Sequence, residues 1–121
     1  MTTPSDLAKF VIELMKAYQG ESHRVIYQNM VKQLLKKELE LDPEMFGFPL
    51  GEGLGVFLFG KGQDFSFGHP GSNLPGTTSW LIGWPDSGNA VIIMANGFRG
   101  DLLSMEILST ISSEYNWPAI R

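Results

Sequence analysis

Cysteine is absent from this chain of 121 residues, and histidine is nearly absent, with only His23 and His69. The lack of cysteine excludes disulfides, zinc-thiolate sites, iron-sulfur sites and a thiol nucleophile. Neither histidine has another histidine or a carboxylate four residues later, which is the spacing of a helical metal site. We therefore expect no metal site.

Positive charge and long apolar runs are also scarce. The chain has nine Lys and Arg residues and thirteen Asp and Glu residues, which gives a net charge of −4. Its longest basic block is Lys36-Lys37. Such a surface offers no positive patch to a phosphate backbone, so no nucleic-acid partner is expected. The apolar stretch 90–95 falls far short of the roughly 20 residues that span a bilayer. No signal-peptide pattern is visible either, so we expect a soluble chain without a membrane partner, its compartment left open.

The residues that are present predict a single domain over 1–121, because 43% hydrophobic and 12% aromatic residues are enough for one core. Thr3, Pro4 and Asp6 have the spacing of a helix start, and Gly20 that of a helix stop. One apolar stripe joins them, formed by Leu7, Phe10, Val11, Leu14, Met15 and Tyr18. A first helix is therefore expected between Thr3 and Gly20.

Beyond this helix the pattern predicts a second helix over 25–37 and a loop over 41–53, which is rich in Gly and Pro. From Leu54 the apolar period becomes two. Strands are expected over 54–59, 65–69, 78–84 and 90–95, followed by a last helix that Asp101 would cap. The predicted fold class is α+β: an antiparallel meander of about four strands, with the helices on one face of the sheet.

The common catalytic and phosphate-binding motifs are missing. The chain has no Gly-x-Ser-x-Gly elbow, no Gly-x-x-x-x-Gly-Lys-Ser/Thr loop and no Gly-x-Gly-x-x-Gly between a strand and a helix. The glycine-rich segment 51–55 precedes a predicted strand, where a phosphate-binding loop would precede a helix. We therefore expect no cofactor.

One segment places a titratable group among glycines. His69 lies at the expected end of a strand, between Gly68 and Gly71, and glycines allow a ligand or another chain to approach closely. The segment has two interpretations: a functional histidine, or an ordinary surface histidine beside a turn.

The segment His69-Pro70-Gly71 is similar to the third active-site motif, Lys-Thr-Gly or His-x-Gly, of the β-lactamase-related serine hydrolases. This family includes class C β-lactamases, penicillin-binding proteins, D-alanyl-D-alanine carboxypeptidases and related esterases. Further segments resemble the family in the same order along the chain: Thr3 to Ala8, Gly53 to Val56, Pro75 to Ser79, and Met94 to Gly97. The resemblance implies the C-terminal part of a β-lactamase/transpeptidase-like fold.

The same resemblance implies roles for individual residues. His69 would be catalytic through its hydrogen bond or partial positive charge, while the N–H of Ser72, directly after Gly71, would supply half of an oxyanion hole. Gly68 and Pro70 would support the motif. Pro70 stands where the family often has Thr or Ser, whose hydroxyl commonly binds the substrate carboxylate. A generic ester, amide or peptide is therefore at least as good a ligand as penicillin.

The nucleophile of the family is missing, because no serine here has a lysine three residues later. Tyr27-Gln28-Asn29 spells the family's second motif, Tyr-x-Asn, but it lies on a predicted helix and close to His69, so we interpret Tyr27 as a helix-face residue. Without the lysine or an equivalent base, no hydroxyl has an evident route to activation. Whether the chain is an enzyme is thus uncertain, and alone it is expected to be inactive.

Two hypotheses follow for the chain as a whole. It is either the C-terminal part of a serine hydrolase or a self-standing, non-catalytic binding or assembly module derived from that fold. Association is expected with either a second copy, giving a homo-oligomer, or a complementing N-terminal hydrolase segment that carries the Ser-x-x-Lys motif.

Overall fold

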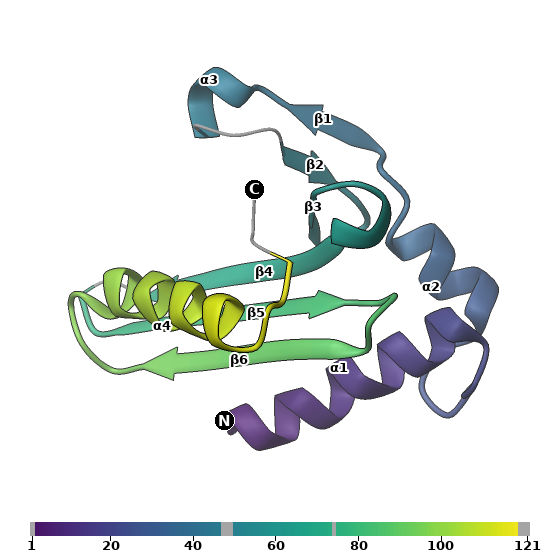
Figure 1. Ribbon diagram of the computed structural model, residues 1–121, viewed down its shortest axis with the longest axis horizontal. Helices are drawn as coiled ribbons and strands as arrows, with labels where there is room; N and C mark the ends of the chain where they lie inside the picture. Colours follow the sequence, from purple (N-terminus) through teal and green to yellow (C-terminus); the bar gives the residue numbers. More distant parts are fainter. Residues whose placement is uncertain (1, 47–49, 74, 119–121) are drawn as a thin grey trace.

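The computed structural model describes residues 2–46, 50–73 and 75–118. Four helices and six strands are found in these residues (Figure 1). In chain order they are α1 (Pro4–Gln19), α2 (Gln28–Leu34), β1 (Leu39–Leu41), α3 (Pro43–Phe46), β2 (Leu50–Glu52), β3 (Phe57–Phe59), β4 (Ser66–Asn73), β5 (Thr77–Trp84), β6 (Asn89–Ala95) and α4 (Gly100–Glu114). A short 3₁₀ turn, Gly62–Asp64, links β3 to β4.

The strands form one antiparallel sheet in the order of the chain, β1-β2-β3-β4-β5-β6. This confirms the α+β class and the antiparallel meander. The sheet has six strands where about four were expected, because β1 and β2 arise in and beside the segment 41–53 that was predicted as a loop. Each of these two strands has only three residues, too few to show an alternating pattern.

Helix α1 forms where the sequence places it. The Thr3 hydroxyl oxygen accepts a hydrogen bond from the Asp6 N–H at 3.1 Å, and Pro4 opens the helix. At the other end Gly20 adopts φ +81°, a left-handed conformation that costs glycine little, and its N–H donates to the carbonyl of Ala17. The helix buries Val11, Leu14, Met15 and Ala17, whereas Phe10, which was expected on the buried stripe, is half-exposed.

Helices α2 and α4 differ from the sequence prediction. Helix α2 begins at Gln28 and ends at Leu34, so it is shorter than the predicted 25–37. Helix α4 begins at Gly100, with Arg99 at its N-cap, and Asp101 lies in its first turn instead of capping it. Gly100 lies so close to β5 that an added Cβ would collide with the Thr78 hydroxyl. Close packing on the sheet therefore sets where α4 begins.

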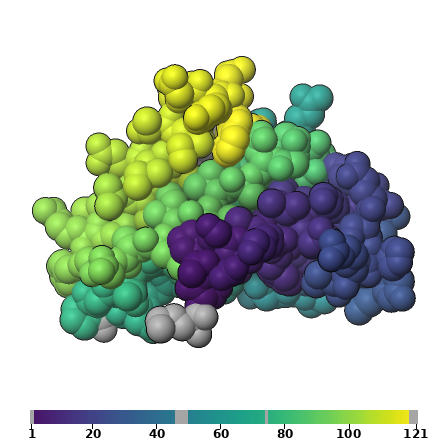
Figure 2. Space-filling model, turned by 90° about the horizontal axis from the view of Figure 1, so that it is seen from below, coloured from purple at the N-terminus to yellow at the C-terminus, as the bar shows by residue number. Residues whose placement is uncertain are grey.

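The helices cover both faces of the sheet, which contradicts the expectation of a single covered face. Figure 2 shows α4 (yellow) and α1 (purple) on opposite sides of the green strands. Alternating residues of β5 and β6 separate into two clusters accordingly. Leu81 and Ile92 pack with α1 and α2, whereas Ile82 and Val91 pack with Leu108 of α4. Because β5 and β6 are apolar at consecutive positions, each face of these strands needs a cover. Within the described residues, no helix combines the length and apolar character needed to cross a membrane.

Close packing between α1 and the sheet gives a first prediction. An added Cβ at Gly83 of β5 would lie 2.9 Å from two Phe67 ring carbons and 3.3 Å from Val11 Cγ1. Gly83→Ala is therefore expected to lower the free energy of unfolding by about 1 to 3 kcal/mol through overpacking. Gly97→Ala is the matched control, because nothing lies within 4 Å of its added Cβ. Equal urea midpoints for the two variants would contradict this packing.

Candidate functional site

Strand β4 has a partner along most of its length on one side but only a short partner on the other. It pairs with β5 from Phe67 to Asn73, yet it pairs with β3 only over Ser66 to Gly68. In the sheet formed by the described residues, the segment His69 to Asn73 therefore has a neighbouring strand on one side alone. We call this segment the open edge of β4. Apart from the Pro70 carbonyl, which the His69 ring contacts, its outward backbone groups can pair with an incoming chain or ligand.

Hydrogen bonding in the β2–β3 hairpin shows which backbone groups face the open edge. The Val56 carbonyl accepts a hydrogen bond across that hairpin, at 2.9 Å, so Val56 faces β2 and the next residue, Phe57, faces β4. Gly68 is the register partner of Phe57 and therefore faces β3. Because backbone groups alternate sides, Pro70 and Ser72 face the same way, where no strand of the described residues lies. Proline suits this position, since it has no N–H to give a neighbouring strand.

His69 is exposed and is the fourth residue of the eight-residue strand β4, so the prediction that it lies at a strand end was wrong. Its Nδ1 atom lies 2.5 Å from the Pro70 carbonyl oxygen, and its ring is tilted against that of Phe57, with centroids 5.5 Å apart. A carbonyl oxygen only accepts, so Nδ1 carries the hydrogen of this bond. In the neutral ring, Nε2 is then the nitrogen left to accept a proton or a hydrogen bond.

The two motif glycines let β4 and β5 lie close together. A Cβ at Gly68 would collide with the backbone carbonyl of Leu81. One at Gly71 would lie 2.5 Å from the Ser79 hydroxyl oxygen. The two glycines thus allow close contact between β4 and β5 in this part of the sheet.

Gly71 and Ser72 line a cleft of about 800 Å³ near the start of α1, whereas His69 does not line it. The other lining residues are Thr2, Asn73, Thr77, Thr78, Ser79, Met94, Ala95 and Asn96. None of these described residues is charged, so the cleft offers hydroxyl and amide groups but no ion. The Thr78 hydroxyl is buried and has no hydrogen-bond partner among the described residues.

Other chemistry suggested by the sequence lies elsewhere or is not found. Tyr27 is exposed at the N-cap of α2, before the helix instead of on its face, and its ring stacks on His23 at 6.1 Å between centroids. It does not line the cleft. Among the described residues no group of three or more His, Cys, Asp or Glu could hold a metal ion. Sequence reasoning expected a strand here that can pair with a substrate, but it could not give the bounds of the open edge, because these depend on the shortness of β3.

Comparison with known proteins agrees with this architecture. The model of the Beta-lactamase family matches residues 1–108, and the chain belongs to this family. Curated protein sequences give no match. Among solved structures, one described as "Crystal structure of SurE with D-Leu" is similar over 98% of this chain, with a TM-score of 0.77 and 21% sequence identity. The chain spans 27% of the length of SurE, so this likeness shows the fold of that part alone.

The membership confirms the family that the sequence resembles, and the SurE likeness agrees with the predicted fold class. Residues His69 to Gly71 lie on β4, the third-last strand of the sheet formed by the described residues, with two strands and a helix after it.

Gly68 and Gly71 give a second prediction, which is that replacing them by alanine lowers the free energy of unfolding by different amounts. Gly68→Ala should destabilise the chain by about 2 to 3 kcal/mol, because the obstructing Leu81 carbonyl is part of the strand and cannot move away. Gly71→Ala is the matched control and should cost less than about 1 kcal/mol, because the Ser79 hydroxyl can rotate to another rotamer. Chemical denaturation measures both, and the reverse order would contradict the assigned strand contacts.

Proposed function

We propose that this chain supplies one wall of a serine acyl-transfer site, in which an ester or amide is cleaved through an acyl-serine. The serine and its activating lysine would come from a segment outside this chain, since no Ser-x-x-Lys is present here. The observation that supports the proposal is the open edge of β4, where His69, Gly71 and Ser72 have no partner strand on one side among the described residues.

In this proposal Ser72 provides half of an oxyanion hole through its backbone. The alternation of β4 directs the Ser72 N–H to the open edge, where a fixed donor can stabilise the negative oxygen of a tetrahedral intermediate. Removal of one such donor in other enzymes costs on the order of 10² to 10³ in rate. The same edge can pair with an extended substrate as an added strand.

His69 would interact with the serine and lysine that the complementing segment brings to the site, through a hydrogen bond or through its positive charge. Its Nδ1–H is held by the Pro70 carbonyl, which leaves Nε2 for a hydroxyl of the complementing segment. In the neutral ring Nε2 accepts a hydrogen bond, and in the protonated ring it lends positive charge to the site. Gly68 and Pro70 support this geometry, Gly68 by its contact with β5 and Pro70 by its carbonyl.

The substrate proposed is a neutral ester, amide or peptide. The cleft beside Ser72 has no charged lining residue among those described, and Pro70 lacks the hydroxyl that would bind a carboxylate. Recognition would then rest on neutral hydrogen-bonding groups. SurE, whose structure was solved with D-Leu, suggests N-acylated leucine esters and amides, which carry no charge, as the first members of this class to test.

The missing nucleophile gives a third prediction. The purified chain should hydrolyse neither nitrocefin nor p-nitrophenyl acetate above the background of albumin, because it lacks the Ser-x-x-Lys pair that activates the serine in the family. Rates with and without the chain at matched protein concentration provide the measurement. Saturable turnover with a burst, together with labelling of one serine by a fluorophosphonate, would show that the chain carries its own nucleophile.

We further propose that residues 1–121 act as a single domain that associates with a second copy or a complementing segment. Helix α4 exposes Leu102, Leu103 and Met105, while its opposite side packs on the sheet through Leu108. Large apolar side chains exposed together on one helix are typical of a surface that contacts another chain. The edge strand β6 adds unpaired backbone groups to this surface.

Association through α4 gives a fourth prediction. Light scattering at micromolar concentration should show a dimer or larger assembly, and Leu103→Lys should shift the population to monomer by placing a charge in the contact. Ser109→Lys is the matched control, because Ser109 is an exposed polar residue of the same helix. A wild-type chain that is monomeric and melts cooperatively would exclude this association and favour the self-standing module.

A further inference from the structure

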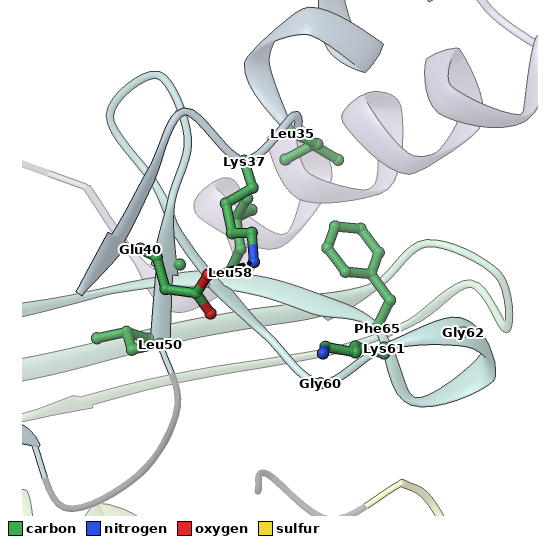
Figure 3. Close-up of a pocket in the computed structure, with 10 residues that line it drawn as sticks. Leu35, Lys37, Glu40, Leu50, Leu58, Gly60, Lys61, Gly62 and Phe65 are labelled. Atoms are coloured by element: carbon green, nitrogen blue, oxygen red, sulfur yellow. Dashed lines mark hydrogen bonds and ion pairs between the residues drawn. The ribbon is translucent and has the colours of Figure 1, made fainter. Parts of the chain in front are cut away.

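A second cavity, of about 530 Å³, lies between the end of α2, the β2–β3 hairpin and the turn before β4 (Figure 3). Its lining residues are Leu35, Lys37, Glu40, Leu50, Gly51, Leu58, Gly60, Lys61, Gly62 and Phe65. Among the described residues, it shares no lining residue with the cleft of Gly71 and Ser72. Its volume falls within the range of about 300 to 1,000 Å³ that is usual for small-molecule sites.

The inner surface of this cavity is apolar. Leu35, Leu50 and Leu58 are buried beneath it, and Phe65 forms a half-buried wall. Gly51 lets the Lys37 side chain lie against the strand at the cavity wall, because an added Cβ there would lie 2.8 Å from Lys37 Cδ. A hydrocarbon chain laid on this surface would leave water, which is favourable by about 25 cal/mol for each Å² of apolar area removed.

The mouth of the cavity has more positive than negative charge. Lys37 Nζ lies 3.2 Å from the Glu40 carboxylate, so these two side chains neutralise each other. The Lys61 ammonium group has no hydrogen-bond or ion-pair partner within the part of the chain that the structure describes. Figure 3 shows the amino groups of Lys37 and Lys61 directed into the space between Leu50 and Phe65. One ammonium group is thus left for an anion.

We propose that this cavity binds a free fatty carboxylate, with the hydrocarbon chain on the leucines and the carboxylate at Lys61. A metal ion does not fit, because Glu40 is the sole carboxylate among the described lining residues. A polyphosphate would have to lose its water against an apolar surface with a single unpaired cation, which disfavours it. The proposal is independent of the acyl-transfer function, because it uses none of the residues at the open edge.

Decanoate below its micelle-forming concentration is the probe, with decanol and decyltrimethylammonium as neutral and cationic controls. In two-dimensional NMR of the full chain, decanoate should shift the amide signals of Gly51, Gly60 and Gly62 with a saturating curve. Decanol should bind several-fold more weakly and the cationic analogue more weakly still. Equal binding of all three probes, or shifts confined to other regions, would overturn the proposal.

Lys61→Met tests the charge while keeping an unbranched apolar stem. It should weaken decanoate binding by about fivefold and leave decanol binding unchanged, whereas Lys9→Met, at an exposed site on α1, should change neither. Gly51→Leu should abolish binding of both ligands by filling the cavity. Unchanged decanoate affinity in Lys61→Met would overturn the assignment of the carboxylate. Co-sedimentation with phosphatidylglycerol vesicles, lost in Gly51→Leu, would assign the cavity to a membrane lipid and overturn the proposal of a free ligand.

Discussion

The unequal pairing of β4 is the constraint on which the candidate site depends. Its eight residues are joined to β5 over seven register pairs, but only three residues meet β3. The backbone groups of a strand form hydrogen bonds on both of its sides. The unpaired stretch therefore presents N–H and C=O groups that a ligand or another chain can bind. Proline at position 70 agrees with this arrangement, because the open side is where a missing N–H does no harm.

The rest of the fold keeps that open stretch in place. Clusters of apolar side chains cover β5 and β6 on both faces, with α1 and α2 on one side and α4 on the other. Such support on rigid elements is what a site needs to hold its donors at fixed positions. The neutral cleft beside Ser72 and the cavity beside Lys61 lie on different parts of this framework, one without charged lining residues and one with excess positive charge at its mouth.

The sequence predicted features that depend on neighbouring residues and missed those that depend on distant ones. The cap at Thr3 and the left-handed Gly20 follow from local chemistry, and both ends of α1 were correct. Asp101 was predicted to cap α4, but the helix begins one residue before it, where Gly100 lies against Thr78 of β5. The place of His69 within β4 follows from pairing with β5, which no local pattern reveals. The motif residues themselves could be found from sequence because their order resembles the family.

Amide hydrogen exchange at Ser72 and Gly71 tests the open edge most directly. These neighbouring residues lie on one strand, yet their N–H groups should face opposite sides, Ser72 toward the open edge and Gly71 toward β5. In the chain kept monomeric by dilution, the Ser72 amide should exchange rapidly and the Gly71 amide should be protected by the ladder. Equal and strong protection at both residues would mean that β4 is paired on both sides, which would contradict an open wall at this site.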